Sequence, residues 1–141
     1  MRLFFTLTKK RLAILLLVVI AALSSLIWVS SLELHYIDGS THAKRMEYIR
    51  SQGVLVEENG FTEKETLIPE TFGEVYLKYN ELQKKGGFNL SPFKGEAVTV
   101  YSYRITGADK TLTLIVHEGE IIGGDIAENS LNGKMREIKR V

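Results

Sequence analysis

The chain has 141 residues, enough for one domain and a short additional segment, and its lack of cysteine excludes disulfides, thiol nucleophiles and cysteine-ligated metal sites. The formal net charge of +1 conceals an asymmetry: residues 1–11 carry four basic residues and no acid, whereas residues 33–141 hold 14 Lys and Arg against 17 Asp and Glu. This acidic body argues against nucleic acid as a partner, because such binding needs clustered basic residues.

Residues 12–32, LAILLLVVIAALSSLIWVSSL, are uncharged and mostly apolar. As a helix they would measure about 31 Å, close to the roughly 30 Å hydrocarbon core of a bilayer. Basic residues 9–11 precede the run, which predicts a transmembrane helix in contact with lipid and a cytoplasmic amino terminus. A cleaved signal peptide is the alternative, although its apolar core would last only about 7–15 residues.

This reading divides the chain into four parts. They are a cytoplasmic basic tail (1–11), a transmembrane helix (12–32), a spacer (33–40) and an extracytoplasmic domain (41–141). The sequence thus predicts a single-pass protein of the cell membrane.

The domain begins with a short helix and a hairpin. Thr41 is a suitable cap for a helix over about residues 42–52, which Gly53 would end. The segment 54–68 is predicted to form two short strands around Asn59-Gly60, a dipeptide suited to a tight turn.

The second helix is predicted from a capping box formed by Thr71 and Glu74, and it would stop at Gly86-Gly87. Its apolar face is predicted to hold Phe72, Val75, Tyr76, Tyr79 and Leu82. A ligand-binding wall is the alternative for such a stripe, but aromatic residues at helical spacing are usually core, so Phe72, Tyr76 and Tyr79 are predicted as core aromatics.

Three strands are predicted after the loop 88–95, over residues 96–106, 111–118 and 120–127, as an antiparallel meander. Apolar residues occur on both faces of 96–106, so its core face stays open. The element order α-β-β-α-β-β-β predicts an α+β fold with two helices packed on one face of an antiparallel sheet, preceded by the transmembrane helix.

Three stretches resemble the family called domain of unknown function 4830: YIRSQG (48–53), IPETFGEVYLKYNELQKKGGFNLSPFKG (68–95) and VHEGEIIGGDI (116–126). The resemblance covers most of residues 42–135. It implies a membrane-anchored protein of low-GC Gram-positive bacteria and brings no established activity. Asn132 stands where the family pattern has an acid, so no role of that acid carries over.

The most suggestive short motif is Gly123-Gly124-Asp125. In a regular strand Ile122, Gly124 and Ile126 share one face, which predicts that Tyr76 or Tyr79 crosses over Gly124. A β-bulge at the glycine pair is the other structural option. A phosphate loop would need a following helix, and a calcium loop would draw on Asp125, Glu128, Asn129 and Asn132 at a spacing that matches no known frame. The glycines are therefore predicted to serve packing, with Asp125 as a local hydrogen-bond acceptor or turn former.

No serine nucleophile elbow, P-loop, zinc-binding HExxH or EF-hand is present in the sequence. His35, His42 and His117 lack the spacing that brings ligands together, so neither a metal nor a cofactor is expected. The sequence predicts a non-enzymatic binding or regulatory module with an envelope or membrane protein as partner. The alternatives are an enzyme whose site is assembled from scattered polar residues, and a modulator that acts on a membrane protein through the anchor helix.

Overall fold

A computed structural model describes residues 9–31 and 36–141, apart from the side chains of residues 11 and 25–31. The chain divides into two compact units, Met1–Leu34 and His35–Val141. His35 and all but the last three residues of the predicted basic tail lie outside the described residues.

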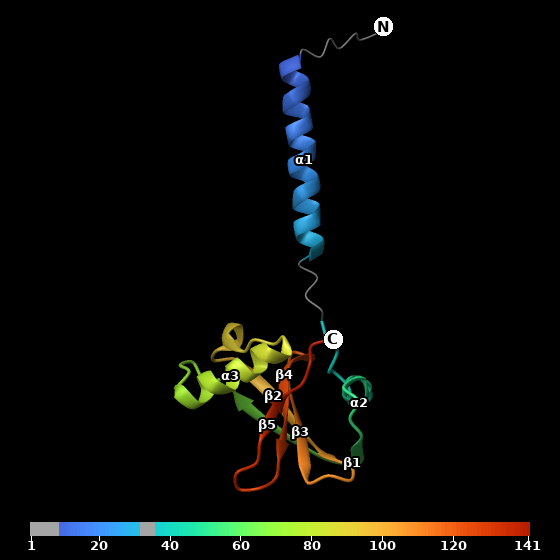
Figure 1. Cartoon of the computed structure of the whole chain (residues 1–141), viewed down its shortest axis with the longest axis vertical. Helices are drawn as coiled ribbons and strands as arrows, with labels where there is room; N and C mark the ends of the chain where they lie inside the picture. The colour runs from blue at the N-terminus through green and yellow to red at the C-terminus, as the bar shows by residue number, and fades with distance from the viewer. Residues whose placement is uncertain (1–8, 32–35) are drawn as a thin grey trace. The chain divides into compact units, whose positions relative to one another are not determined.

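The first unit contains helix α1 (Lys9–Ser31; Figure 1). Within the described part of the chain, no helix combines the length and apolar character that crossing a bilayer requires. The predicted transmembrane helix over residues 12–32 is therefore corrected. Crossing a bilayer requires about 20 consecutive, predominantly apolar residues in one helix.

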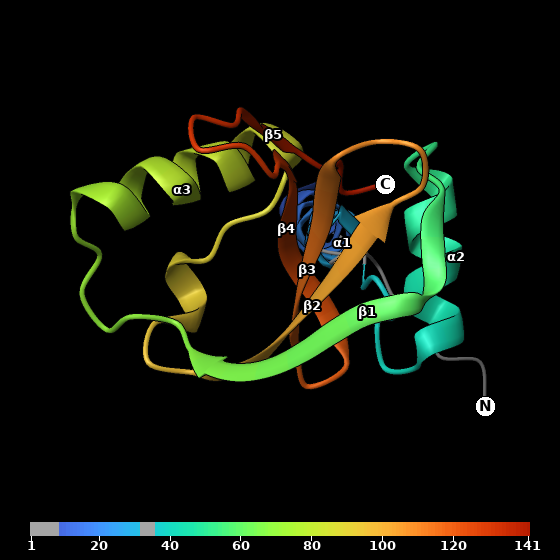
Figure 2. The same cartoon turned by 90° about the horizontal axis from the view of Figure 1, so that it is seen from below.

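The second unit is built on a five-stranded sheet whose neighbouring strands are all antiparallel and follow one another in chain order (Figure 2). The strands are β1 (Val56–Leu67), β2 (Ala97–Ile105), β3 (Lys110–His117), β4 (Glu120–Glu128) and β5 (Met135–Glu137). The predicted three-strand meander is confirmed as β2, β3 and β4. The hairpin between β3 and β4 places Glu118 and Gly119 at φ of 47° and 84°, as a two-residue loop of matching twist requires. The sequence does not predict β5.

The predicted hairpin around Asn59-Gly60 is instead part of one continuous strand, β1. Val56 lies opposite Ile105, and Phe61 lies opposite Tyr103. Between these two pairs β1 advances by five residues and β2 by only two, so the three extra residues of β1 form a bulge. Gly60 is not among the glycines with positive φ, which a tight turn at this dipeptide would require. The dipeptide therefore bends the strand without reversing it.

Helices α2 (His42–Ser51) and α3 (Glu74–Gly86) cover opposite faces of the sheet (Figure 2), so the predicted packing of both helices on one face is wrong. A 3-10 turn, Ser91–Phe93, follows α3. On β3, Leu114 belongs to the core cluster under α2, and its neighbour Ile115 belongs to the cluster under α3. On β2, Tyr103 belongs to the cluster under α2 and Val98 to the cluster under α3. Because successive strand residues point to opposite faces, these strands are buried on both sides and need a helix on each.

The helix ends agree only partly with prediction. The start of α2 is confirmed, because the Thr41 side chain accepts a hydrogen bond of 3.2 Å from the Lys44 N–H. The capping box of Thr71 and Glu74 is wrong, since α3 begins at Glu74 without a side-chain cap. Its predicted end is confirmed by Gly87, which has a left-handed φ of 91°.

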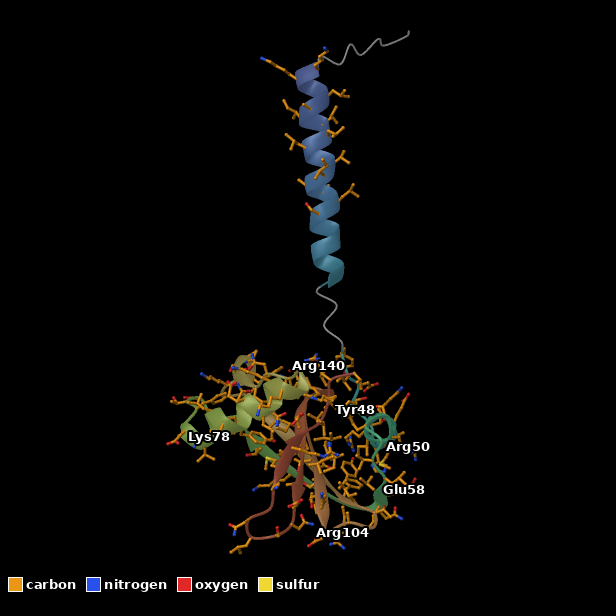
Figure 3. All side chains as sticks on the ribbon, viewed as in Figure 1. Tyr48, Arg50, Glu58, Lys78, Arg104 and Arg140 are labelled. Carbon is orange, nitrogen blue, oxygen red and sulfur yellow. The ribbon has the colours of Figure 1, made fainter. Side chains whose placement is uncertain are left out.

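The chain beyond β5 connects both helices. Ile138 is 1% exposed. The Tyr48 hydroxyl of α2 donates a hydrogen bond of 2.7 Å to the Lys139 carbonyl, and the Arg140 N–H donates one of 2.8 Å to the Gly86 carbonyl of α3 (Figure 3). This tail fixes the positions of α2 and α3 relative to the sheet between them.

Candidate functional site

Gly123-Gly124-Asp125 lies inside β4, immediately after a β-bulge. Val116 pairs with Ile121 and Ile115 with Gly123, so Ile122 is the extra residue. Along β4, the residues that face α2 are Ile121, Gly124 and Ile126. The residues that face α3 are Ile122, Gly123 and Asp125. The predicted sharing of one face by Ile122 and Gly124 is therefore wrong, because the bulge shifts the alternation by one residue.

Each glycine admits a neighbour where a side chain would not fit. A Cβ on Gly123 would lie 2.8 Å from Gln83 Oε1, and this same oxygen accepts a 2.8 Å hydrogen bond from the Gly124 N–H. On the other face, a Cβ on Gly124 would press on the Thr113 carbonyl oxygen and lie 2.6 Å from Ile138 Cδ1. The pair serves packing in this fold, but neither tyrosine that the sequence proposed crosses Gly124.

Asp125 is a buried acid, 4% exposed, that accepts a 2.8 Å hydrogen bond from the Tyr79 hydroxyl. Loss of solvation raises the pKa of Asp125, and the hydrogen bond from Tyr79 partly opposes that rise. Burial, with the Asp125 carboxylate as a lesser cause, raises the pKa of Tyr79 as well. Asp125 is thus an acceptor for a helix distant in sequence, and its place inside a strand corrects the turn-former alternative.

Asp125→Asn is expected to weaken the pH dependence of stability while preserving the fold. The raised pKa means that the carboxyl group favours folding below its ordinary pKa, and this contribution is lost as pH rises through the folded-state value. Asparagine keeps an oxygen acceptor for Tyr79 without a charge, so the variant should be at least as stable at pH 7. Urea unfolding between pH 4 and 8 measures this. A clear loss of stability at pH 7 would contradict it.

The predicted core aromatics of α3 meet one another but differ in exposure. The ring centroids of Phe72 and Tyr76 are 4.6 Å apart, and those of Tyr76 and Tyr79 are 5.8 Å apart. Phe72 is buried, the two tyrosines are half-buried, and Val75 is 84% exposed. The apolar stripe is therefore narrower than predicted, and part of it faces a cavity.

Two residues of α3, Asn80 and Gln83, are buried although they are polar, and the apolar pattern of the sequence does not predict this. The Asn80 side-chain oxygen accepts a 2.8 Å hydrogen bond from the Leu90 N–H and holds the following loop against the helix. Gln83 lies four residues after Tyr79 and seven after Tyr76, so helical spacing places it on the same face. Gln83 could have been predicted as buried by continuing the helical spacing of Tyr76 and Tyr79 to the next position, whatever the polarity of the residue there.

A cavity of about 240 Å³ opens between α3 and the sheet and is called the α3 cleft below. It is lined by Thr66, Leu67, Ile68, Pro69, Tyr76, Tyr79, Val98, Val100, Thr113 and Ile115. The only polar side chains in this lining are hydroxyl groups. The volume lies under the roughly 300–1,000 Å³ of sites for drug-sized ligands, so it suits one or two amino-acid side chains.

The cleft adjoins the open edge of the sheet, because β1 is the first strand in the sheet order. The Ile68 N–H donates a 2.9 Å hydrogen bond to the Glu96 carbonyl, toward the β2 side. Antiparallel ladders alternate bonded and unbonded positions. The main-chain groups of Glu63, Glu65 and Leu67 consequently point away from β2, toward the side on which no described strand lies.

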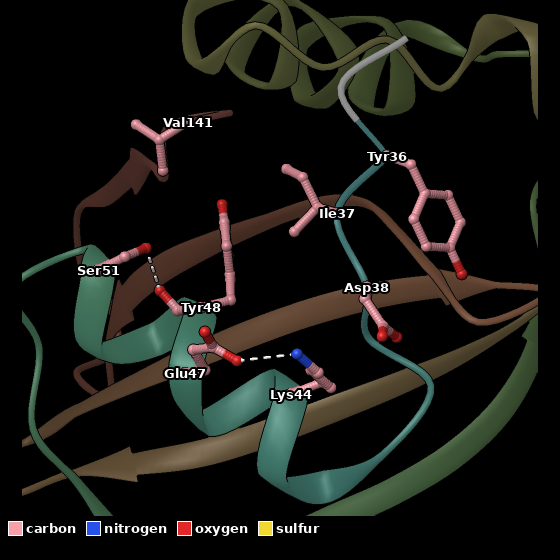
Figure 4. A pocket seen from close by; sticks show the side chains of 8 residues that line it. All are labelled: Tyr36, Ile37, Asp38, Lys44, Glu47, Tyr48, Ser51 and Val141. Carbon is pink, nitrogen blue, oxygen red and sulfur yellow. Dashed lines mark hydrogen bonds and ion pairs between the residues drawn. The ribbon is translucent and has the colours of Figure 1, made fainter. Parts of the chain in front are cut away.

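A second hollow, of about 390 Å³, lies between residues 36–38 and α2 (Figure 4). Its charged groups are engaged with near neighbours. Lys44 pairs with Glu47 at 3.2 Å, and Asp38 accepts a 2.6 Å hydrogen bond from the Ser40 hydroxyl. Because its charged groups already have partners within the chain, this hollow is the weaker candidate.

The two described histidines make structural contacts. His42 stacks on Phe61 with ring centroids 4.9 Å apart, and His117 Nδ1 lies 3.0 Å from the Ala97 carbonyl oxygen. Across residues 9–31 and 36–141, no three His, Asp or Glu side chains are grouped in a way that could hold a metal ion.

A family model described as Domain of unknown function (DUF4830) matches residues 54–126. The chain belongs to this family. No curated protein and no solved structure matches the chain.

The matched DUF4830 region distinguishes the two cavities. It contains β1, α3 and every residue that lines the α3 cleft, together with Asp125. The second hollow is lined by residues 36–51 and Val141, all outside the match. The α3 cleft and the adjoining edge of β1 are thus the candidate site that lies within the matched region.

Proposed function

We propose that the DUF4830 domain is a non-enzymatic binding module that takes an extended segment of a partner protein along β1. The observation that carries the proposal is the continuity of the open β1 edge with the α3 cleft, which meet at Thr66 and Leu67. A segment paired with residues 63–67 would gain main-chain hydrogen bonds from the edge and direct an apolar side chain toward the cleft. Strand addition of this kind combines main-chain affinity with side-chain selectivity.

The chemistry of the cleft supports binding over turnover. A general acid or base must lie within hydrogen-bond reach of its substrate, and no carboxyl, imidazole or amine group lines the cleft. Asp125 has a perturbed pKa, which often marks a catalytic group, but it is 4% exposed and does not line the cleft.

The charge of β1 favours a protein as the partner. The strand carries Glu57, Glu58, Glu63 and Glu65 against Lys64. A nucleic acid would meet repulsion here, because its phosphates need basic contacts. Arg50 of α2 pairs with Glu58 at 3.2 Å (Figure 3). Glu63 and Glu65 are the acids of β1 nearest the cleft, and among the described residues neither takes part in an ion pair.

Random heptapeptides displayed on phage and selected on the immobilised full-length chain should yield sequences that need both parts of the site. Glu65→Pro removes an outward N–H without removing a ladder bond, and Val100→Trp fills the cleft. Each should weaken binding of the selected synthetic peptides about tenfold, the effect of losing one good contact.

Glu65→Thr is the matched control, since it removes the charge but keeps the N–H, and it should bind within a few-fold of the wild type. Fluorescence anisotropy gives the affinities, and circular dichroism establishes that each variant is folded. Selected peptides that bind Glu65→Pro and Val100→Trp as tightly as the wild type would contradict the proposal. So would a selection that yields no binder.

A further inference from the structure

The exposed part of β1 presents a charge pattern that differs between its two faces. Glu63 lies opposite Tyr101, on the α2 side of the sheet, and Glu65 follows on the same side. Lys64 lies opposite Val100, on the α3 side. All three side chains are exposed, and among the described residues none of them takes part in an ion pair.

This pattern opposes pairing of β1 with the same strand of a second copy. If a two-fold axis joins the β1 strands of two copies into one continuous sheet, the α2 side of one copy continues as the α2 side of the other. Paired residues must therefore come from the same face of the sheet. Centring the pair on Lys64 sets Lys64 against Lys64 and Glu63 against Glu65. Centring it on either glutamate sets that glutamate against itself. Every such register that pairs five or more of residues 61–67 with the second copy places like charges directly opposite each other, which destabilises a strand pair.

On the basis of the proposed function, we infer that the segment that pairs with β1 is a strand of another protein with Lys or Arg at two alternate positions. These basic residues lie opposite Glu63 and Glu65 on the α2 side of the sheet. The positions that flank each basic residue face the α3 side, and the apolar side chain opposite Thr66 reaches the α3 cleft. The partner strand therefore alternates basic and apolar residues.

The inference is consistent with how edge strands are protected. Charged side chains on an exposed edge prevent indiscriminate pairing, because most strands cannot neutralise them. A strand of the complementary pattern turns the same charges into an attraction. Directly opposite ion pairs contribute modestly, and two of them correspond to about a tenfold change in affinity that weakens as salt is added.

Three synthetic peptides test the charge pattern against the full-length chain. All have valine at the positions that face α3, and they carry Lys, Ser or Glu at the positions that face α2. The wild type should bind the Lys peptide about tenfold more tightly than the Ser peptide and more tightly still than the Glu peptide. The double variant Glu63→Lys/Glu65→Lys should reverse this order.

Glu47→Lys/Glu81→Lys is the matched control, because it makes the same change in net charge at exposed helix positions away from β1. It should keep the wild-type order. The inference about charge is overturned if the β1 variant ranks the three peptides as the wild type does. It is also overturned if the control variant changes the ranking as much as the β1 variant does. Binding of the Ser peptide that is lost in Glu65→Pro would still support the proposed function. If none of the three peptides binds, both proposals fail.

Discussion

Gly124→Val is expected to leave the second unit of the chain without a cooperatively folded state. The first carbon of the new side chain would overlap the Thr113 carbonyl oxygen of β3 and come within 2.6 Å of Ile138 Cδ1. The backbone oxygen cannot move without breaking the pairing of β3 with β4. The cost should exceed about 4 kcal/mol, a large part of the roughly 5–15 kcal/mol that stabilises a domain. Thermal unfolding followed by circular dichroism measures it.

Gly123→Ala is the control for this prediction. Its Cβ would meet Gln83 Oε1 at 2.8 Å and Leu90 Cδ2 at 3.2 Å, which are the far ends of side chains that can shift. We expect a folded variant destabilised by about 1–3 kcal/mol, the usual penalty of overpacking. A cooperative transition of Gly124→Val close to that of the wild type would contradict the assigned register of β4.

The sequence is sufficient to predict individual elements where local chemistry decides them. Thr41 and Gly87 mark a helix start and a helix end because capping depends on near neighbours. The meander of β2, β3 and β4 follows from short turns between β-branched runs. These features need no knowledge of what packs against them.

The predictions that fail depend on contacts between distant parts of the chain. Apolar residues on both faces of β2 leave open which side each helix covers, and only packing decides it. The dipeptide Asn59-Gly60 suits a turn, yet pairing of β1 with β2 holds it in a bulged strand. β5 is three residues long and is formed by pairing with β4.

The candidate site could be predicted only in part, for the same reason. The adjacent glycines 123 and 124 do mark a close approach. The identity of the approaching groups depends on the bulge at Ile122, which exchanges the faces of the strand, and on Gln83, one of two buried polar residues of α3. The α3 cleft draws on four separate segments, and no local motif marks it.

Gly86→Ala is expected to destabilise the domain, although helix propensity alone predicts the opposite. Replacing glycine by alanine inside a helix usually stabilises it by up to about 1 kcal/mol. Here the added Cβ would overlap the Ile138 carbonyl oxygen, a backbone atom of the tail that crosses α3 at this position. Relief requires the tail to detach, which exposes Ile138 and breaks the hydrogen bond between Arg140 and the Gly86 carbonyl.

The expected cost is about 3 kcal/mol, the order of the burial of one isoleucine together with the strain of overpacking. Urea unfolding of Gly86→Ala measures it, with the neighbouring exposed position as a control, since Lys85→Ala should change stability by only a few tenths of a kcal/mol. Ile138→Ala should cost much less in the Gly86→Ala background than in the wild type, because a detached tail has no burial left to lose. A variant more stable than the wild type would show that helix propensity prevails and that the tail does not cross α3 at Gly86.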